Sequence, residues 1–501
     1  MTINQLDKHL QESQIKLADL ANDPQSYGIC PGSVQKTEAG CLFMSRGADQ
    51  HLYVMGKGKL FDAFEGDQLS SEVKKCPLSA ANAKTLRRYF PFTAPTASPS
   101  RGISIGLGDR LGNATPGHIR SVKSKPVFPI LAQQSIRELN FTDRTYEDVL
   151  DAASWAVFQE GYTTGFGADG DHLKTTSEIK MALDYGFTMI TLDCSDHINN
   201  DIPDQHADQV CEAYGRLPES LRRSYEKKYL RQPVKLKSGQ SFTYSEDELK
   251  RLALIYGDAI SFTVDIYNSL LKPCDHKLIF EMSIDETQTP TSPNAHYFVA
   301  SELIDQGVVL DHLAPRFCGE FQKGIDYIGS ADQFEAELII HTAIADELGY
   351  KISVHSGSDK FTLFPIIGRI TKGSFHLKTA GTSWLEAIRL IAIKDPDLYR
   401  EIHRFAIESL PEAMKHYSIN GRPENVADLD TLSDAELPGL MDLDDARQII
   451  HINYGQILQA SDEQGQDRFK SRMYKVWQEN EQAYAISLSK HIDKHIEYLG
   501  L

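Results

Sequence analysis

The chain has 501 residues, of which 41% are hydrophobic and 24% charged. This is the composition of a globular protein, and the length is sufficient for a large buried core. The formal net charge of −18 argues against nucleic acid or an anionic membrane as a partner, because both are bound through basic surfaces.

The N-terminal segment predicts a small α+β unit. Residues 1–20 have the mixed-charge pattern of an amphipathic helix and lack the basic and apolar regions of a signal peptide. The segment CLFMSRGADQHLYVMGKG (41–58) has the pattern of a β-hairpin. We therefore expect residues 1–98 to form an N-terminal α+β cap.

From about residue 100 onward one unit recurs, in which a short apolar run ends in polar residues and an amphipathic helix follows. Thr145 with Asp148 has the spacing of a helix N-terminal cap, and Gly161 and Gly349 stand where helices must end. The eight apolar runs are ISIGLGD (103–109), VFPILAQ (127–133), TGFGADGDH (164–172), FTMITLDCSDH (187–197), KLIFEMSIDE (277–286), VVLDHLAPRF (308–317), YKISVHSGSD (350–359) and SFHLKTAG (374–381).

Continuous apolar strands that alternate with helices indicate a parallel sheet covered on both faces. Eight such strands predict an α/β fold of the (β/α)8 TIM-barrel type over residues 99–400, with an open doubly wound sheet as the alternative. Residues 200–272 are too many for one crossover helix, so we expect a helical insertion after the fourth strand. Residues 401–501 predict a helical C-terminal extension.

The cysteines and the hydropathy pattern bear on the location of the protein. No run approaches the ~18 uninterrupted apolar residues of a transmembrane helix. The seven cysteines contain no C-x-x-C pair, which disfavours a disulfide framework or a thiolate zinc site. We expect reduced thiols in a cytoplasmic protein.

Polar side chains collect where the predicted strands end, and in this kind of barrel those ends form the active-site face. Because eight strand ends converge on one mouth, residues far apart in the sequence can share a site. From the third predicted strand onward, these residues are Asp169, Asp171, His172 and Lys174; Asp193, Ser195, Asp196 and His197; Glu281, Asp285 and Glu286; Arg316, Glu320 and Lys323; His355, Ser356, Ser358, Asp359 and Lys360; and His376, Lys378 and Thr379.

Three imidazoles in this set predict a divalent-metal site. A catalytic ion needs about three protein ligands and an open position. His172, His355 and His376 follow strands three, seven and eight and form the predicted ligand set. His197 and Asp193 are alternatives for one ligand. A single histidine at a strand end is otherwise a hydrogen-bonded rim residue.

Two carboxylates are candidates for proton transfer, and further strand-end residues for substrate binding. Glu281 directly follows apolar residues, so we expect burial to raise its pKa toward acid–base use, unless a lysine pairs with it. Asp171 is a second acid–base group or orients the neighbouring His172. The candidate substrate contacts are Arg110, Arg316 and Lys378 as carboxylate binders, together with Asp109, Asp193, Ser356 and Asp359.

The segment GLGDRLG (106–112) only partly matches a dinucleotide-binding fingerprint. Its third glycine falls one residue late, and a proline interrupts the helix that should follow. We therefore expect no nicotinamide cofactor and interpret this segment as a substrate-binding loop.

Several longer strings resemble the tagaturonate epimerase family, namely GDRLGNATPGHIR, GFGADGDHLKT, LDCSDHI, FEMSIDETQTPTSP, LAPRFCGEFQKGIDYIG, SVHSGSDKF and FHLKTAGTSWLEA. The resemblance implies a divalent-metal-dependent enzyme of hexuronate catabolism that interconverts D-tagaturonate and D-fructuronate, with relatives that act on tagatose and fructose. It supports His172, His355 and His376 as metal ligands and suggests Asp171 and Glu281 as the acid–base pair. Zinc is the expected ion, with manganese, cobalt or nickel as alternatives.

The chemistry of this reaction limits the mechanism. The inverted carbon is β to the ketone, so its C–H bond is not acidified through an enolate. We expect a retro-aldol route, in which a base takes the hydroxyl proton, the adjacent carbon–carbon bond breaks, the metal holds the enediolate, and the aldehyde re-adds from its other face. Direct deprotonation at carbon and transient oxidation by NAD are the alternatives.

Two other functions use the same features. One is a metal-dependent sugar-acid aldolase or isomerase, and the other is a sugar-acid-binding protein without activity. Paired acid–base groups beside a metal site disfavour the pure binder. The expected partner is a small ketohexuronate or ketohexose, and we expect a homodimer formed through the extra helices.

Overall fold

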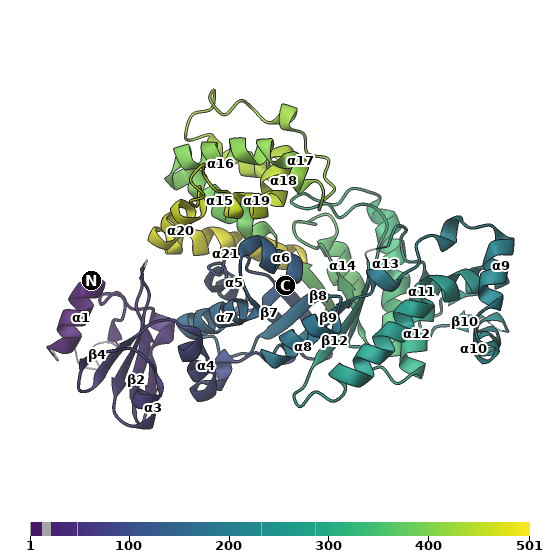
Figure 1. Ribbon diagram of the computed structural model, residues 1–501, viewed down its shortest axis with the longest axis horizontal. Helices are drawn as coiled ribbons and strands as arrows, with labels where there is room; N and C mark the ends of the chain where they lie inside the picture. The colour runs from purple at the N-terminus through teal and green to yellow at the C-terminus, as the bar shows by residue number, and fades with distance from the viewer. Residues whose placement is uncertain (1, 13–21, 48, 232, 286, 380) are drawn as a thin grey trace.

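The eight apolar runs form the strands of a closed parallel barrel in this computed structural model, which describes residues 2–12, 22–47, 49–231, 233–285, 287–379 and 381–501 (Figure 1). The order around the described barrel is β12-β13-β14-β15-β6-β7-β8-β9. The predicted α/β barrel is therefore confirmed, including its glycine-rich third strand. The strands are β6 (Ile103–Leu107), β7 (Val127–Ser135), β8 (Gly167–Leu173), β9 (Met189–Asp193), β12 (Ile279–Ile284), β13 (His312–Pro315), β14 (Lys351–Val354) and β15 (Phe375–Thr379).

Helices between the strands begin and end at the residues that the sequence indicates. The Thr145 hydroxyl accepts a hydrogen bond from the backbone N–H of Asp148 and so caps α7 (Tyr146–Glu160). The same helix ends at Gly161, whose φ of 59° lies in the left-handed region that glycine tolerates best. The other helices around the barrel are α5 (Thr115–Val122), α6 (Ile136–Thr142), α8 (Thr176–Asp184), α12 (Pro293–Asp305), α13 (Ala331–Leu348), α14 (Phe364–Thr371) and α15 (Thr382–Lys394).

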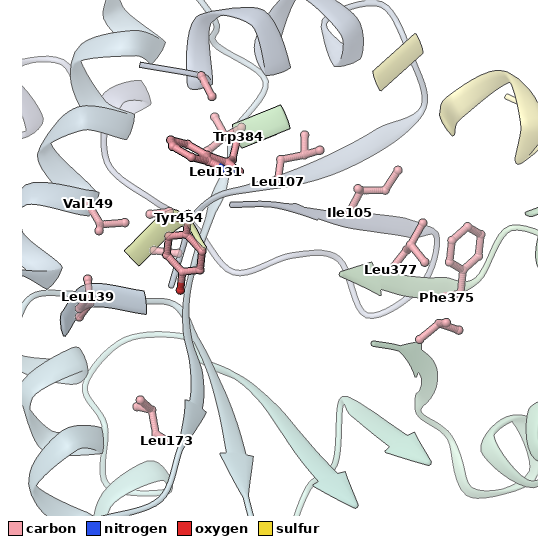
Figure 2. Packing of buried hydrophobic residues seen from close by; sticks show 14 of the residues in the cluster. Ile105, Leu107, Leu131, Leu139, Val149, Leu173, Phe375, Leu377, Trp384 and Tyr454 are labelled. Carbon is pink, nitrogen blue, oxygen red and sulfur yellow. The ribbon is translucent and has the colours of Figure 1, made fainter. Parts of the chain in front are cut away.

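The hydrophobic core continues from the barrel into the C-terminal helices. Figure 2 shows Ile105 and Leu107 of β6 near Leu377 of β15, with Trp384 of α15 and Tyr454 of α19 (Tyr454–Gln459) in the same cluster. Burial of a large apolar side chain contributes about 1.5–3 kcal/mol. The C-terminal extension is therefore packed against the barrel as part of one core.

The N-terminal residues form an antiparallel sheet at one end of the molecule (Figure 1). The expected hairpin is present, because Cys41 of one strand pairs with Met55 of the next. Part of the helix expected over residues 1–20 is α1 (Ile3–Gln11), and residues 1 and 13–20 of that expectation lie outside the described residues. The described strands are β1 (Gln35–Thr37), β2 (Gly40–Met44), β3 (Leu52–Gly56), β4 (Asp67–Ser70) and β5 (Val73–Cys76), with helices α3 (Lys59–Ala63) and α4 (Ala80–Tyr89).

The insertion and the C-terminal extension have the predicted helical character, and lie at different sides of the barrel (Figure 1). The insertion contains α9 (Ala207–Gly215), α10 (Glu219–Tyr225), the short pair β10 (Val234–Lys235) and β11 (Ser241–Phe242), and α11 (Glu246–Ile266). The extension contains α16 (Pro396–Glu408), α17 (Leu410–Ala413), α18 (Asp444–Ile452), α19, α20 (Lys470–Glu479) and α21 (Glu481–Tyr498).

Several expectations from the sequence stay predictions. They include the division into domains at residues 98 and 400, the cytoplasmic location and the homodimer. The seven cysteines all lie in the described part of the chain and have free thiols. Among the described helices, none combines the length and the apolar character needed to cross a bilayer.

Candidate active site

A cavity of about 100 Å³ lies at the carboxyl ends of the barrel strands. It adjoins a wider hollow of about 530 Å³, with which it shares wall residues such as Asp285 and His355. Strand-end residues of the inner wall are Asp171, His172, Asp285, His355, Ser356 and Lys378, and residues from other segments are Arg110, Arg137, Gln322, Lys323, Lys360 and His451.

His172, Asp285 and His355 form a cluster on this wall. One ligand atom from each residue lies within 4.8 Å of the other two. Nδ1 of His355 is 3.1 Å from Oδ2 of Asp285, and Nε2 of His172 is 3.8 Å from Oδ1 of the same carboxylate. Two imidazoles and a carboxylate are ligands that suit a divalent transition metal with open coordination positions.

One ring nitrogen of each imidazole in this cluster also contacts a second carboxylate. Nδ1 of His172 lies 2.6 Å from Oδ1 of Asp171, and Nε2 of His355 lies 2.8 Å from Oε1 of Glu281. A neutral imidazole that donates one N–H to a carboxylate keeps a lone pair on its other nitrogen. The donor set therefore fits a metal ion that binds at the cavity face of both rings.

The backbone at the site is strained at two non-glycine residues. His172 has a φ of 54° and Ser356 a φ of 50°, both in the left-handed region. Such conformations cost about 1–3 kcal/mol each and persist where the surrounding structure fixes a functional geometry. Here they set the directions of one predicted metal ligand and of the residue that follows the other.

The electrostatics of the two histidines follow from the carboxylates around them. Burial alone would lower the pKa of His172, but Asp171 and Asp285 raise it well above its usual value. The pKa of His355 is also raised, because Asp285 and Glu281 outweigh burial and the nearby Lys378 ammonium. A cation is therefore favoured at this position, whether it is a proton or a metal ion.

Lys378 lies at the centre of three buried carboxylates. Its Nζ is 2.6 Å from Asp171, 3.0 Å from Asp169 and 3.0 Å from Glu281. Burial would lower the pKa of Lys378, but these carboxylates raise it well above its usual value. Burial raises the pKa of Asp169 to about 6 despite the same ammonium.

The structure corrects the expectation that burial leaves Glu281 with a raised pKa. Burial does act in that direction, but the Lys378 ammonium and His355 hold the pKa of Glu281 well below its usual range. Glu281 is also fully buried and is not part of the cavity wall. The alternative weighed from the sequence, a buried pair with a lysine, is the one observed. Lys378 and His172 likewise outweigh burial and keep the pKa of Asp171 low.

His376 lies apart from the other two predicted metal ligands. It groups with Glu281 and His312 in the barrel interior, where its ring stacks on His312 with centroids 5.0 Å apart. Its Nδ1 lies 2.9 Å from Oγ of Ser104. The described geometry thus brings His172 and His355 together with Asp285, and not with His376. The alternative ligand His197 stacks on Phe262, and Glu286 lies outside the described residues.

The candidate substrate contacts divide into two groups. Arg110, Ser356 and Lys378 line the cavity, and Arg316 lines only the wider hollow. Three of the candidate carboxylates do not line the cavity and are bonded elsewhere. Asp109 accepts hydrogen bonds from the backbone N–H groups of Leu111 to Thr115, and Asp193 accepts one from the N–H of Ser195. Asp359 pairs with Arg447 and His491. Asp109 shapes the loop that carries Arg110, and Asp359 ties a barrel loop to the C-terminal helices.

Asp285 and His451 are among the cavity residues to which no role was assigned from the sequence. Asp285 directly follows Ile284, the last residue of the fifth strand, and this position at a strand end was the available signal. His451 comes from α18 in the C-terminal extension, about 70 residues after the last barrel strand, with no local pattern to mark it.

A closed (β/α)8 barrel with a His–Asp–His cluster in a polar cavity at its strand ends defines an enzyme that acts on a small polar molecule. Residues 30–499 match the UxaE tagaturonate epimerase family, and the chain belongs to this family. It is therefore an isomerase, and the resemblance seen in the sequence is confirmed.

Known relatives agree along almost the whole chain. The tagaturonate/fructuronate epimerase of Thermotoga maritima is 42% identical over 427 residues, which are 85% of this chain and 86% of that protein. The native crystal structure of the fructuronate-tagaturonate epimerase UxaE from Cohnella laeviribosi is 46% identical, with a TM-score of 0.93 over 97% of this chain and 99% of that one. A structure of the same enzyme with two glycerol molecules is 45% identical, with a TM-score of 0.93 over 100% of both chains.

Proposed function

We propose that this protein interconverts D-tagaturonate and D-fructuronate, and that one divalent metal ion binds to His172, Asp285 and His355. The two named relatives, which are epimerases of this pair, support the substrate. One observation supports the metal site most strongly. In each imidazole, one ring nitrogen contacts a carboxylate, either Asp171 or Glu281, and the other ring nitrogen approaches Asp285.

Asp285 takes the place of His376 in this proposed ligand set. A set of two histidines and one carboxylate suits zinc, manganese, cobalt and nickel, and zinc remains the first choice. When bound, such an ion supplies a Lewis acid that polarises the substrate carbonyl.

Asp171 is the residue proposed to accept and return the substrate's hydroxyl proton. It lines the cavity, it is ionised at neutral pH, and the Lys378 ammonium lies 2.6 Å from its Oδ1. In the retro-aldol route, Asp171 holds that proton while the bond between the α and β carbons breaks and re-forms on the opposite face. Glu281 has no access to the cavity and acts as a positioning residue for His355.

The test is turnover of D-fructuronate before and after removal of metal. Protein treated with a chelator should lose epimerisation and regain it on addition of one equivalent of zinc, manganese, cobalt or nickel. Asp171→Asn is assayed at saturating metal, because this carboxylate also bonds to the proposed metal ligand His172, and it should lose about 100-fold or more in kcat, as expected for a general base. The exposed Asp430→Asn is the matched control. Full turnover by the chelated protein, or near-wild-type rates in Asp171→Asn, would contradict the proposal.

A further inference from the structure

Beyond the proposed metal cluster, the cavity wall carries cationic and neutral donors whose hydrogen-bonding capacity is not fully used by the described part of the chain. Arg110 is 5% exposed, and its Nε and Nη2 donate to Oε1 of Glu138 at 2.9 and 2.7 Å. Its third nitrogen, Nη1, is buried and has no hydrogen-bond partner in the described part of the chain. A buried guanidinium N–H without an acceptor is costly, and Arg110 lines the cavity, so this group is available to a ligand with acceptor oxygens.

Lys323 supplies a second donor. Its Nζ donates to Oγ of Ser356 at 3.0 Å, and it makes no ion pair with any described carboxylate. The other two lysines of the wall are already engaged, because Lys378 contacts three carboxylates and Nζ of Lys360 donates to three backbone carbonyls. Burial and the nearby Arg110 and Arg137 lower the pKa of Lys323, a destabilisation that a bound anion would relieve.

His451 supplies a third. It is 2% exposed, and neither of its ring nitrogens has a hydrogen-bond partner among the described residues. Burial, with Arg110 and Lys323 close by, keeps the pKa of His451 well below its usual value, so the ring is neutral. A neutral imidazole still donates one N–H, and it can do so without adding a further charge to the two cations.

The chain leaves space for this ring at Gly381, where α15 begins. A Cβ atom at position 381 would fall on the imidazole of His451. A glycine at this point therefore lets a residue of the C-terminal extension reach the barrel cavity, which is bordered by both residues. Packing against the barrel thus gives the extension a direct part in the site.

We propose that Arg110, Lys323 and His451 form the subsite that binds the carboxylate of a ketohexuronate. The inference rests on the proposed function and deepens it, because it assigns the discrimination between a sugar acid and its neutral ketose to three named residues. A carboxylate offers two oxygens with about four lone-pair directions, which suits one guanidinium N–H, one ammonium and one imidazole N–H. The C-terminal extension becomes necessary for substrate recognition through His451.

The first experiment compares D-fructuronate with D-fructose in Lys323→Met, with the exposed Lys57→Met as control. A charge-assisted hydrogen bond to a carboxylate corresponds to about 10- to 100-fold in affinity. We expect kcat/KM for D-fructuronate to fall by that factor in Lys323→Met, with turnover of D-fructose unchanged. Equal losses on both substrates, or wild-type kcat/KM on D-fructuronate, would overturn the subsite.

His451→Phe provides a variant that should not disturb folding. The ring makes no hydrogen bond to a described residue, so the change removes no protein hydrogen bond and should leave the melting temperature close to that of the wild type. We expect KM for D-fructuronate to rise about tenfold, as for loss of one hydrogen bond to a charged group. An unchanged KM with an unchanged melting temperature would remove His451 from the subsite.

Binding of D-gluconate, measured by calorimetry, separates this inference from the proposed function. Binding that Lys323→Met weakens supports the subsite even if the wild-type protein does not convert D-fructuronate, which would count against the proposed function alone. Conversion of D-fructuronate without Lys323-dependent binding of D-gluconate would overturn the subsite and keep the function. Tighter Lys323-dependent binding of inorganic phosphate than of D-gluconate would assign the subsite to a phosphate and so overturn the carboxylate.

Discussion

Nε2 of His355 lies 2.8 Å from Oε1 of Glu281, so a fully buried carboxylate is bonded to a histidine of the cavity wall. The other nitrogen of the ring, Nδ1, approaches Asp285 at 3.1 Å. A carboxylate in this position fixes the tautomer of a metal-binding histidine and increases its basicity. It has no path to the substrate, so its effect on turnover passes through His355.

Glu281→Gln should therefore weaken metal binding. Loss of a carboxylate behind a metal-binding histidine costs about 10- to 100-fold in metal affinity or activity. We expect a Kd for zinc, measured by chelator competition, to rise by this factor, with kcat recovering at saturating metal. The control is Glu302→Gln, because Glu302 is a buried carboxylate that pairs with Lys228 and does not line the cavity. Unchanged metal affinity with lost turnover would return Glu281 to an acid–base role.

Asp285→Asn and His376→Asn distinguish the two possible third ligands. Because Asp285 groups with His172 and His355 and His376 does not, only the first change should reduce the metal content of the purified protein. We expect Asp285→Asn to retain less than about a tenth of the metal after dialysis, and His376→Asn to retain nearly all of it. The reverse order, measured by elemental analysis, would favour the three-histidine set.

Asp359→Asn should lower stability and leave KM unchanged. The Asp359 carboxylate is buried, lies 2.6 Å from Nη2 of Arg447, and connects the loop after β14 to α18 and α21. Removal of one partner from a buried ion pair costs about 3–5 kcal/mol, because the other charge stays buried. Chemical denaturation should show this loss. Asp430→Asn, whose partner Arg404 is exposed, should cost about 1 kcal/mol or less. A raised KM without loss of stability would support the substrate contact expected from the sequence.

Asp359 also pairs with His491, and this second ion pair predicts a dependence of stability on pH. Burial would lower the pKa of His491, but Asp359 and Glu386 raise it. The stability that this histidine contributes is fully present below its unfolded pKa of about 6.5 and is lost as the pH rises through the folded value. The pKa of Asp359 is held well below its usual range, so its contribution is present above about pH 4 and is lost on further acidification. We expect the urea midpoint of the wild-type protein to fall between pH 6 and pH 9, and the midpoint of His491→Gln to fall less over the same range. An equal decrease of the midpoint in both proteins would contradict this.

The barrel could be predicted because its cause is local. Continuous apolar runs such as residues 127–132, with helices capped by residues such as Thr145, determine a parallel sheet wherever the runs pair. Convergence of the strand ends then predicted that His172 and His355 would meet, although 183 positions separate them along the chain.

The features of the site that the sequence did not predict depend on side-chain direction and on contacts between residues far apart in the sequence. His376 is the second residue of β15 and lies in the barrel interior beside His312, two residues before Lys378, which lines the cavity. His355 follows the last residue of β14 and reaches the cavity. The charge state of Glu281 depends on Lys378, about 100 residues away, which outweighs burial. His451 reaches the cavity only through packing of the C-terminal helices on the barrel. None of these relationships leaves a pattern in the local sequence.

The measurement that tests the central claim most directly is an NMR time course of the protein with D-fructuronate in deuterated water, with and without one equivalent of divalent metal. We expect D-tagaturonate to form only in the presence of metal and to carry no deuterium at the inverted carbon. Formation of no epimer with zinc, manganese, cobalt or nickel would contradict the proposed function. Deuterium at that carbon would keep the function and contradict cleavage of the carbon–carbon bond.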